Sequence, residues 1–170
     1  MISRRSLLLA ALASSCATRN REAALADFRT FMNALPRQTA GTVPFEPSRL
    51  EGKVVLVTFI ATWCFPCLTE LRVLNRLEAD HGPRGFANVL VGMDLEGSAV
   101  LEPFAEGYQL TMPLLVGNDY LRSGESVFGR IRELPSRVLF ARSGELVVGY
   151  SWFPKYEDLE RLVASEVSKT

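Results

Sequence analysis

The sequence is poor in the residues that most metal sites require. Its 170 residues include three cysteines and one histidine, His81. A structural zinc ion needs four ligands, usually two cysteine pairs or cysteines combined with histidines, so this supply argues against such a site. Lysine plus arginine and aspartate plus glutamate balance at 19 each, and no excess of positive charge indicates binding to nucleic acid. We therefore expect no metal, no cofactor and no nucleic-acid partner.

Long apolar runs and repeats are absent as well. No stretch of 18 or more apolar residues occurs, so the sequence encodes no conventional membrane-spanning helix. There is no internal repeat and no low-complexity tract. The length is that of about one domain, and 48% hydrophobic and 22% charged residues are typical of a globular α/β protein.

Residues 1–16 have the features of an export signal. An arginine pair precedes a short apolar core, residues 7–13, which ends in two serines and Cys16. This is the pattern of a secretory signal peptide. Its end resembles a bacterial lipoprotein cleavage site, at which the cysteine becomes the lipid-carrying first residue, and its arginine pair resembles a twin-arginine signal. We expect a protein exported to the periplasmic side of the cell envelope and anchored to the membrane through Cys16. Conventional cleavage, which would give a soluble periplasmic protein, is the alternative.

The most informative motif is Cys64-Phe65-Pro66-Cys67. It follows a continuous, largely β-branched run, residues 54–60, and precedes leucines at helical spacing. A cysteine at the start of a helix lies beside free backbone N–H groups and a partial positive charge, which favours the reactive thiolate. A disulfide across two residues closes too short a loop to stabilise a fold strongly. The pattern therefore predicts a thioredoxin-like redox motif.

The rest of the chain predicts alternating strands and helices around a mixed central sheet, with helices on both faces. We expect residues 17–44 to form an N-terminal helix and a connector, and residues 45–170 to form the main domain. The apolar stripe of the N-terminal helix either packs on this domain, which we favour, or faces a partner. The expected helices cover residues 22–35, 64–80, 99–108 and 154–167, with a short one inside 118–133; the expected strands cover residues 54–60, 89–93, 112–116, 137–140 and 146–150; residues 36–47 are expected to be irregular.

These motifs resemble the thioredoxin superfamily, and most closely its exported TlpA/ResA-like thiol-disulfide oxidoreductases. The matching stretches are residues 52–59, residues 61–67 with Glu70, and Leu134-Pro135-Ser136, so the resemblance covers about residues 45–168. It implies a thioredoxin-like α/β fold and an enzyme that exchanges disulfides with protein partners. It also favours action as a reductant, which requires an upstream membrane electron donor. The sequence itself leaves the direction open, since the same cysteine pair can act in an oxidase or an isomerase.

The resemblance implies a role for each matching residue. Cys64 corresponds to the exposed nucleophile and Cys67 to the partly buried resolving cysteine. Pro135 corresponds to a cis-proline that faces the disulfide, where the backbone of its neighbour receives an extended substrate segment. The expected substrate-binding residues are Trp63, Phe65, Pro66 and Leu134, although Trp63 could equally be a core tryptophan.

Glu70 lies three residues after Cys67, so the two share one face of the expected helix. Apolar neighbours that bury Glu70 would raise its pKa and make it a proton carrier for Cys67; the alternative is a solvated glutamate. Thr58 stands where thioredoxins carry a buried aspartate, so proton handling must differ from theirs. Four arginines near Pro135 are expected to be scattered and solvated, although they could bias the choice of partner: Arg122, Arg130, Arg132 and Arg137.

Two other functions remain open at this point. A dithiol can hold a soft ion such as Cu(I), which thiolates favour, and the chain would then be a metal-delivery module. Alternatively, the domain could be an interaction module in which the cysteines have no redox role.

Overall fold

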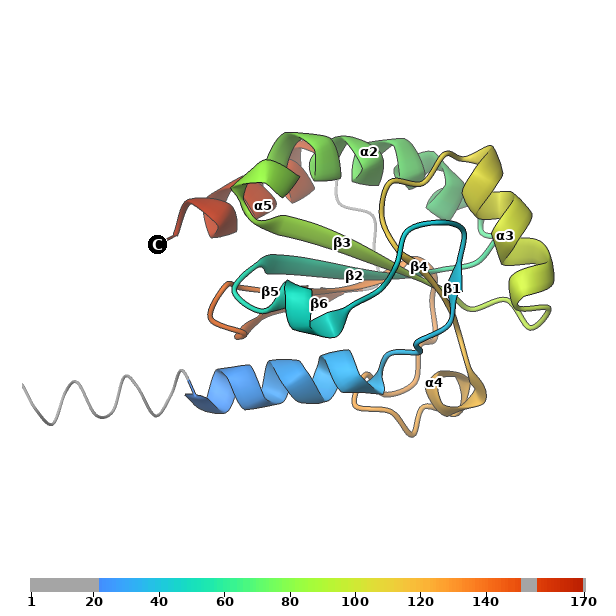
Figure 1. The fold of residues 1–170 in the computed structure, drawn as a ribbon, viewed down its shortest axis with the longest axis horizontal. Helices are drawn as coiled ribbons and strands as arrows, with labels where there is room; N and C mark the ends of the chain where they lie inside the picture. Colours follow the sequence, from blue (N-terminus) through green and yellow to red (C-terminus); the bar gives the residue numbers. More distant parts are fainter. Residues whose placement is uncertain (1–21, 151–155, 170) are drawn as a thin grey trace, which may run out of the picture.

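A six-stranded mixed sheet lies between helices on both of its faces in the computed structural model, which describes residues 22–150 and 156–169 (Figure 1). The strands are β1 (Thr39–Ala40), β2 (Val54–Ile60), β3 (Phe86–Gly92), β4 (Leu114–Val116), β5 (Ser136–Phe140) and β6 (Leu146–Tyr150), in the spatial order β1-β4-β3-β2-β5-β6. β2, β3 and β4 run parallel, whereas β1, β5 and β6 each pair antiparallel with a neighbour. The predicted mixed sheet is confirmed. The expected signal peptide and Cys16 lie outside the described residues.

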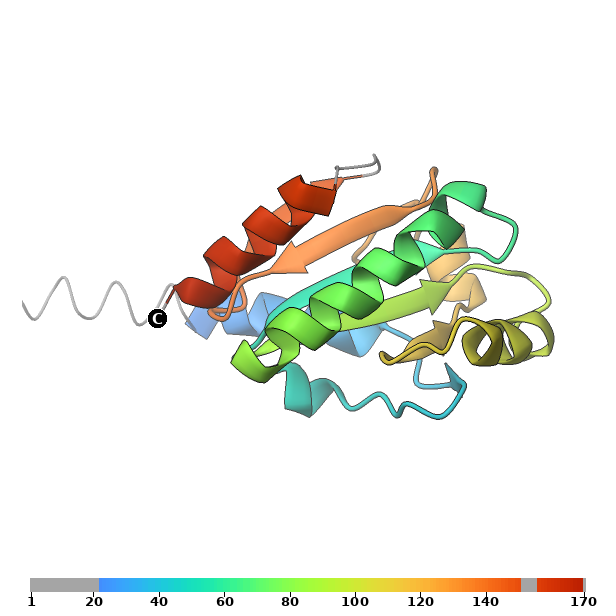
Figure 2. The ribbon, with the colours of Figure 1, turned by 90° about the horizontal axis from the view of Figure 1, so that it is seen from above.

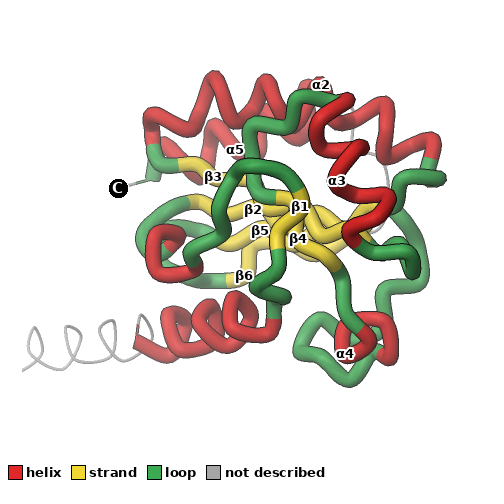
Figure 3. The backbone as a smooth tube through the Cα atoms, turned by 45° about the vertical axis from the view of Figure 1, so that its right-hand side comes forward, coloured by secondary structure: helices red, strands yellow, loops and turns green. Residues whose placement is uncertain are grey.

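Two helices cover one face of the sheet, and a third covers the other. α2 (Phe65–His81) and α5 (Tyr156–Ser168) lie side by side on the first face (Figure 2). The N-terminal helix, residues 22–34, lies on the opposite face. α3 (Ser98–Gly107) flanks the β1 and β4 edge, and α4 (Asp119–Ser123) follows β4 (Figure 3). No helix in the described ranges has both the length and the hydropathy needed to cross a membrane.

β2 is the central element, because both of its faces are covered. All seven of its residues are buried, as expected for a continuously apolar strand within a parallel sheet. Alternate side chains of β2 enter two separate core clusters. The first cluster lies under α2 and α5, and the second contains Phe28 and Met32 of the N-terminal helix. The expectation that this helix packs on the main domain is therefore confirmed.

Several strands differ from the sequence prediction, among them β4, which starts two residues after the expected segment 112–116 begins. β3 begins at Phe86, three residues before the expected start, because two N–H groups of the polar residue Asn88 find acceptors on α2. Its side-chain amide donates to the Leu74 carbonyl oxygen at 3.0 Å, and its backbone N–H donates to the Glu78 carboxylate at 2.7 Å. β1 lies in the segment that was expected to be irregular, where two residues pair with β4.

Candidate active site

The two motif cysteines form a disulfide at the N-terminus of α2. Cys64 and Cys67 are joined with their Cα atoms 5.2 Å apart. Cys64 is the N-cap residue, and its Sγ accepts a hydrogen bond from the backbone N–H of Cys67 at 3.2 Å. Pro66 lies in the first helical turn, where its missing N–H costs no hydrogen bond. The predicted helix start is therefore confirmed, and a helix N-terminus donates to the sulfur of Cys64.

The cysteines are less accessible than the sequence indicated. Cys64 is 4% exposed and Cys67 is 1% exposed, so the expectation of an exposed Cys64 is wrong for this disulfide form. The sulfur of Cys64 turns inward to Cys67 and the helix, while its neighbours Trp63 and Phe65 are 73% and 74% exposed. Trp63 is therefore a surface residue and not a core tryptophan. Leu95, which follows β3, is 82% exposed, and no pattern in the sequence indicated a role for it.

The turn before the cysteines is bound to the end of β3. The backbone N–H and the hydroxyl of Thr62 both donate to the buried carboxylate of Asp94, at 3.0 and 2.6 Å. Arg122 in turn donates to the backbone carbonyl oxygens of Asp94 and Gly117, each at 2.7 Å. The expectation that Arg122 is solvated is therefore wrong. The position of Asp94 at the end of a buried strand was the signal that could have indicated this anchor.

The Leu134–Pro135 peptide bond is cis, which is the conformation that the resemblance implied. Ser136, the next residue, pairs with Phe59 near the end of β2. Pro135 therefore lies at the same end of the β2–β5 strand pair as the turn that leads to Cys64. Leu134 packs against both core clusters, one of which contains the two cysteines.

Glu70 and Arg137 form an ion pair inside the molecule. Glu70 is 6% exposed and Arg137 is 1% exposed. The alternative of a solvated Glu70 and the expectation of a solvated Arg137 are therefore both wrong. Arg137 pairs opposite Thr58 in the β2–β5 register. Among the other arginines, Arg130 and Arg132 are exposed as expected.

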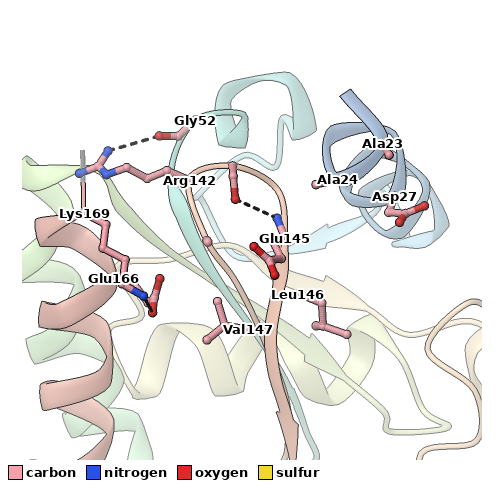
Figure 4. A pocket seen from close by; sticks show the side chains of 12 residues that line it. Ala23, Ala24, Asp27, Gly52, Arg142, Glu145, Leu146, Val147, Glu166 and Lys169 are labelled. Atoms are coloured by element: carbon pink, nitrogen blue, oxygen red, sulfur yellow. Dashed lines mark hydrogen bonds and ion pairs between the residues drawn. The ribbon is translucent and has the colours of Figure 1, made fainter. Parts of the chain in front are cut away.

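A separate open cleft of about 1040 Å³ lies near the start of β2, between the N-terminal helix, the β5–β6 turn and α5 (Figure 4). The cysteines, in contrast, follow the end of β2. Three of the charged side chains that line the cleft bind within the chain: Arg142 donates to the carbonyl oxygens of Gly52 and Val167, and Lys169 pairs with Glu166. We therefore place the candidate active site at the disulfide and not in this cleft.

Comparisons with known sequences point to thiol-disulfide chemistry. Residues 29–125, more than half of the chain and including both motif cysteines, match the AhpC/TSA family. The chain is similar to a protein named thiol-disulfide oxidoreductase ResA from Oceanobacillus iheyensis, with 39% identity over 67 residues, which covers 39% of this chain and 34% of that protein. A ResA from Geobacillus kaustophilus is 29% identical over 119 residues, covering 69% of this chain and 66% of that protein. The matches therefore span from about a third to just under two thirds of these relatives.

Solved structures establish the fold. A thiol-disulfide isomerase from Corynebacterium glutamicum superimposes with a TM-score of 0.66 at 16% identity, over 80% of this chain and 95% of that one. A putative thiol:disulfide interchange protein DsbE from Chlorobium tepidum gives a TM-score of 0.64 at 20% identity, over 79% and 96% of the two chains. The predicted thioredoxin-like fold is confirmed.

Proposed function

Because the chain belongs to the AhpC/TSA family, we propose that it is a thiol-disulfide oxidoreductase that exchanges disulfides with protein partners. The observation that carries this proposal is the Cys64–Cys67 disulfide at the N-terminus of α2, with a backbone N–H directed at Cys64 Sγ. The same N–H would stabilise the Cys64 thiolate in the reduced form. Such a pair can cycle between a dithiol and a disulfide without any other cofactor.

In the reductive direction, the Cys64 thiolate attacks a partner disulfide, and one partner sulfur leaves as a thiolate. A mixed disulfide now joins Cys64 to the partner. Cys67 then loses its proton and attacks Cys64 Sγ, which releases the second partner thiolate and forms the Cys64–Cys67 disulfide. The partner has gained two electrons, and its thiolates take up protons. An upstream dithiol donor at the membrane must return two electrons to this chain before the next cycle.

The partner would bind across the exposed apolar side chains around the disulfide. Trp63 and Phe65 flank Cys64, and Leu95 follows the strand that anchors the turn. Pro66 is also exposed and Leu134 is partly buried, whereas Pro135 is buried, so its part would be to set the backbone beside it that receives the partner segment. An extended partner segment with apolar residues beside its cysteine fits this surface, since it would cover these side chains.

Glu70 is the residue that we assign to the control of Cys67. It lies one helical turn after Cys67 and is buried with it on the same side of α2. A buried carboxylate at this distance affects the ionisation of the thiol by its charge. Cys67 must ionise before it can attack the mixed disulfide, so this charge bears on the resolving step.

The cellular location is inferred from residues 1–16 alone. Their signal-like pattern supports export to the periplasmic side of the envelope and attachment through a lipid on Cys16. Outside the cytoplasm, the dithiol state needs a dedicated electron source, which is why a membrane donor belongs to the proposal.

Reduction of a protein disulfide, such as those of insulin, tests the function directly. The parent protein with dithiothreitol should accelerate the reaction, whereas Cys64→Ser and Cys67→Ser should each abolish the acceleration. In the reduced parent, alkylation at mildly acidic pH should label Cys64 before Cys67. Cys67→Ser should also accumulate a mixed disulfide through Cys64. A Cys16→Ala control should retain full activity. If both cysteine variants match the parent, the proposed function is wrong.

A further inference from the structure

A buried ion pair connects the two segments that form the redox site. Glu70 lies on α2, three residues after Cys67, and Arg137 lies on β5, two residues after Pro135. The guanidinium of Arg137 contacts the carboxylate of Glu70 across the interface between helix and sheet. This pair therefore joins the helix that carries the cysteines to the strand that follows the cis-proline.

The register of the sheet directs Arg137 toward α2. Arg137 pairs with Thr58, and directly opposed residues of an antiparallel pair have their side chains on the same face. The next residues on that face, Leu56 and Leu139, belong to the core cluster under α2. A full guanidinium charge is thus placed in this cluster, with the carboxylate of Glu70 against it.

The charge of Arg137 is permanent, whereas that of Glu70 is not. A guanidinium does not lose its proton in proteins. If Glu70 took up a proton, the buried cation would lose its counter-charge, and an uncompensated buried charge is strongly unfavourable. Arg137 therefore stabilises the ionised form of Glu70. Burial alone would have had the opposite effect, and this was the expectation from the sequence.

We propose that Arg137 is a positioning residue of the redox site, which keeps Glu70 ionised beside Cys67 and balances its charge. On this basis Glu70 acts on the cysteines through its charge and does not carry their protons at neutral pH. The proposal rests on the proposed redox role of the Cys64–Cys67 pair. It assigns to Arg137 a role that acts through Glu70, without contact with the substrate.

Removal of Arg137 and removal of the charge of Glu70 should shift the pH at which the thiols ionise in opposite directions. Without Arg137, nothing balances the carboxylate of Glu70 once it ionises. In the alkaline range where the thiols titrate, this charge disfavours a second negative charge nearby, so the thiols should ionise at higher pH. Without the charge of Glu70, the unbalanced guanidinium favours a thiolate, so they should ionise at lower pH. Arg137 from β5 contacts Glu70, Thr58 of β2 lies opposite Arg137, and Cys67 is buried one helical turn before Glu70 on α2. Of these, Cys67 titrates in the range to be measured.

Thiolate absorbance against pH tests this inference on the full chain in a Cys16→Ala background, so that only the motif cysteines contribute. We expect Arg137→Met to move the titration of the reduced protein upward by about one pH unit and Glu70→Gln to move it downward by about one pH unit. The double variant, which carries both changes, should titrate close to the parent. Arg137→Lys keeps the charge and should also stay close to the parent.

Arg132→Met is the matched control, because Arg132 is an exposed arginine close to Pro135, and its removal should leave the curve unchanged. If Arg137→Met does not fold, the shape-preserving Glu70→Gln decides alone. An unchanged or upward titration of Glu70→Gln overturns the inference. So does a folded Arg137→Met variant whose curve overlaps the parent, or a double variant displaced as far as one of the single variants.

The outcome is separable from that of the proposed function, because the titration does not measure turnover. Opposite shifts in a protein that fails to reduce insulin would reject the redox function and leave the role of Arg137 intact. Normal insulin reduction with coincident titrations would reject the role of Arg137 and leave the function intact.

Discussion

Asp94 accepts two hydrogen bonds from Thr62, one from the backbone N–H at 3.0 Å and one from the hydroxyl at 2.6 Å. Thr62 lies two residues before Cys64, and Asp94 lies two residues after the end of β3. The turn that presents the disulfide is therefore held by the central sheet, through a carboxylate whose own backbone is held by Arg122. The position of Cys64 depends on this anchor, because residues 61–63 belong to no helix or strand.

Removal of the anchor should weaken the fold and the reaction together. Asp94→Ala leaves two donors of Thr62 without their acceptor, and a buried unsatisfied group costs about 1–3 kcal/mol. We expect the free energy of unfolding of the oxidised protein to fall by about 2 kcal/mol in urea denaturation, with slower insulin reduction. Glu96→Ala, at an exposed position on the same loop, should match the parent. Equal stability of Asp94→Ala and the parent would contradict the claim that the hydrogen bonds from Thr62 to Asp94 stabilise this turn.

The exposed apolar side chains around the disulfide should affect the reaction with protein partners and not the reaction with small disulfides. Leu95→Ser removes an exposed apolar side chain from the proposed contact surface. We expect reduction of a protein disulfide to slow by about fivefold, which corresponds to ~1 kcal/mol for a contributing interface residue. The rate with a small disulfide reagent should not change. Leu146→Ser on β6, another exposed leucine, is the control. Equal slowing with both kinds of substrate would contradict a binding role.

Glu78 should make stability depend on pH. Burial raises the pKa of Glu78 above its usual value, while hydrogen bonds from Asn88 and the charge of Lys53 oppose this shift. A carboxyl whose pKa is raised on folding binds its proton more tightly in the folded state. Its contribution to stability is therefore fully present below the unfolded pKa and is lost as the pH rises through the folded pKa.

Urea denaturation at several pH values should detect this effect. Across that window, the free energy of unfolding of the parent should fall with rising pH relative to Glu78→Gln, which cannot ionise. Glu106→Gln, at an exposed position on α3, serves as the control. Parallel pH profiles of the parent and Glu78→Gln would show that the burial of Glu78 has no energetic consequence.

Cys16 should determine membrane attachment and have no effect on the redox pair. Cys16→Ala removes the expected site of the lipid, so the protein should leave the membrane fraction or remain unprocessed. The reduction potential of the purified domain should stay the same. Fractionation and the mass of the mature N-terminus measure the two outcomes. A Cys16→Ala protein that is processed normally and remains with the membrane would contradict the lipoprotein hypothesis.

Local patterns predicted most of the fold. The apolar run of residues 54–60 became β2 with the expected bounds, and the motif that starts at Cys64 became the start of α2. Both signals arise from neighbouring residues. A strand that is buried on both faces requires a continuous run of apolar residues, and an amphipathic helix requires apolar residues at helical spacing. The prediction failed at Asn88, which looks like a loop residue until its partners on α2 are known.

The parts of the site that escaped prediction depend on contacts between distant residues. Glu70 and Arg137 are 67 positions apart, and Thr62 and Asp94 are 32 apart. No spacing in the sequence relates the members of either pair. An arginine at an alternating position of a short strand looks solvated unless its counter-charge is known. β1, with two residues, is likewise defined only by its pairing with β4.

The N-terminal helix, in its described part, starts at the end of the domain that lies away from the disulfide. The described part of this helix starts near the start of β2, and the helix that carries the disulfide follows the opposite end of β2 (Figure 1). Five residues lie between Cys16 and residue 22, the first described residue of this helix, and a segment of this length spans at most about 20 Å. A chain anchored to a bilayer through Cys16 would therefore have a short tether at one end of the domain and its disulfide at the end away from the bilayer. A donor rooted in the same bilayer would have to extend its own cysteines beyond the height of the domain to reach that end.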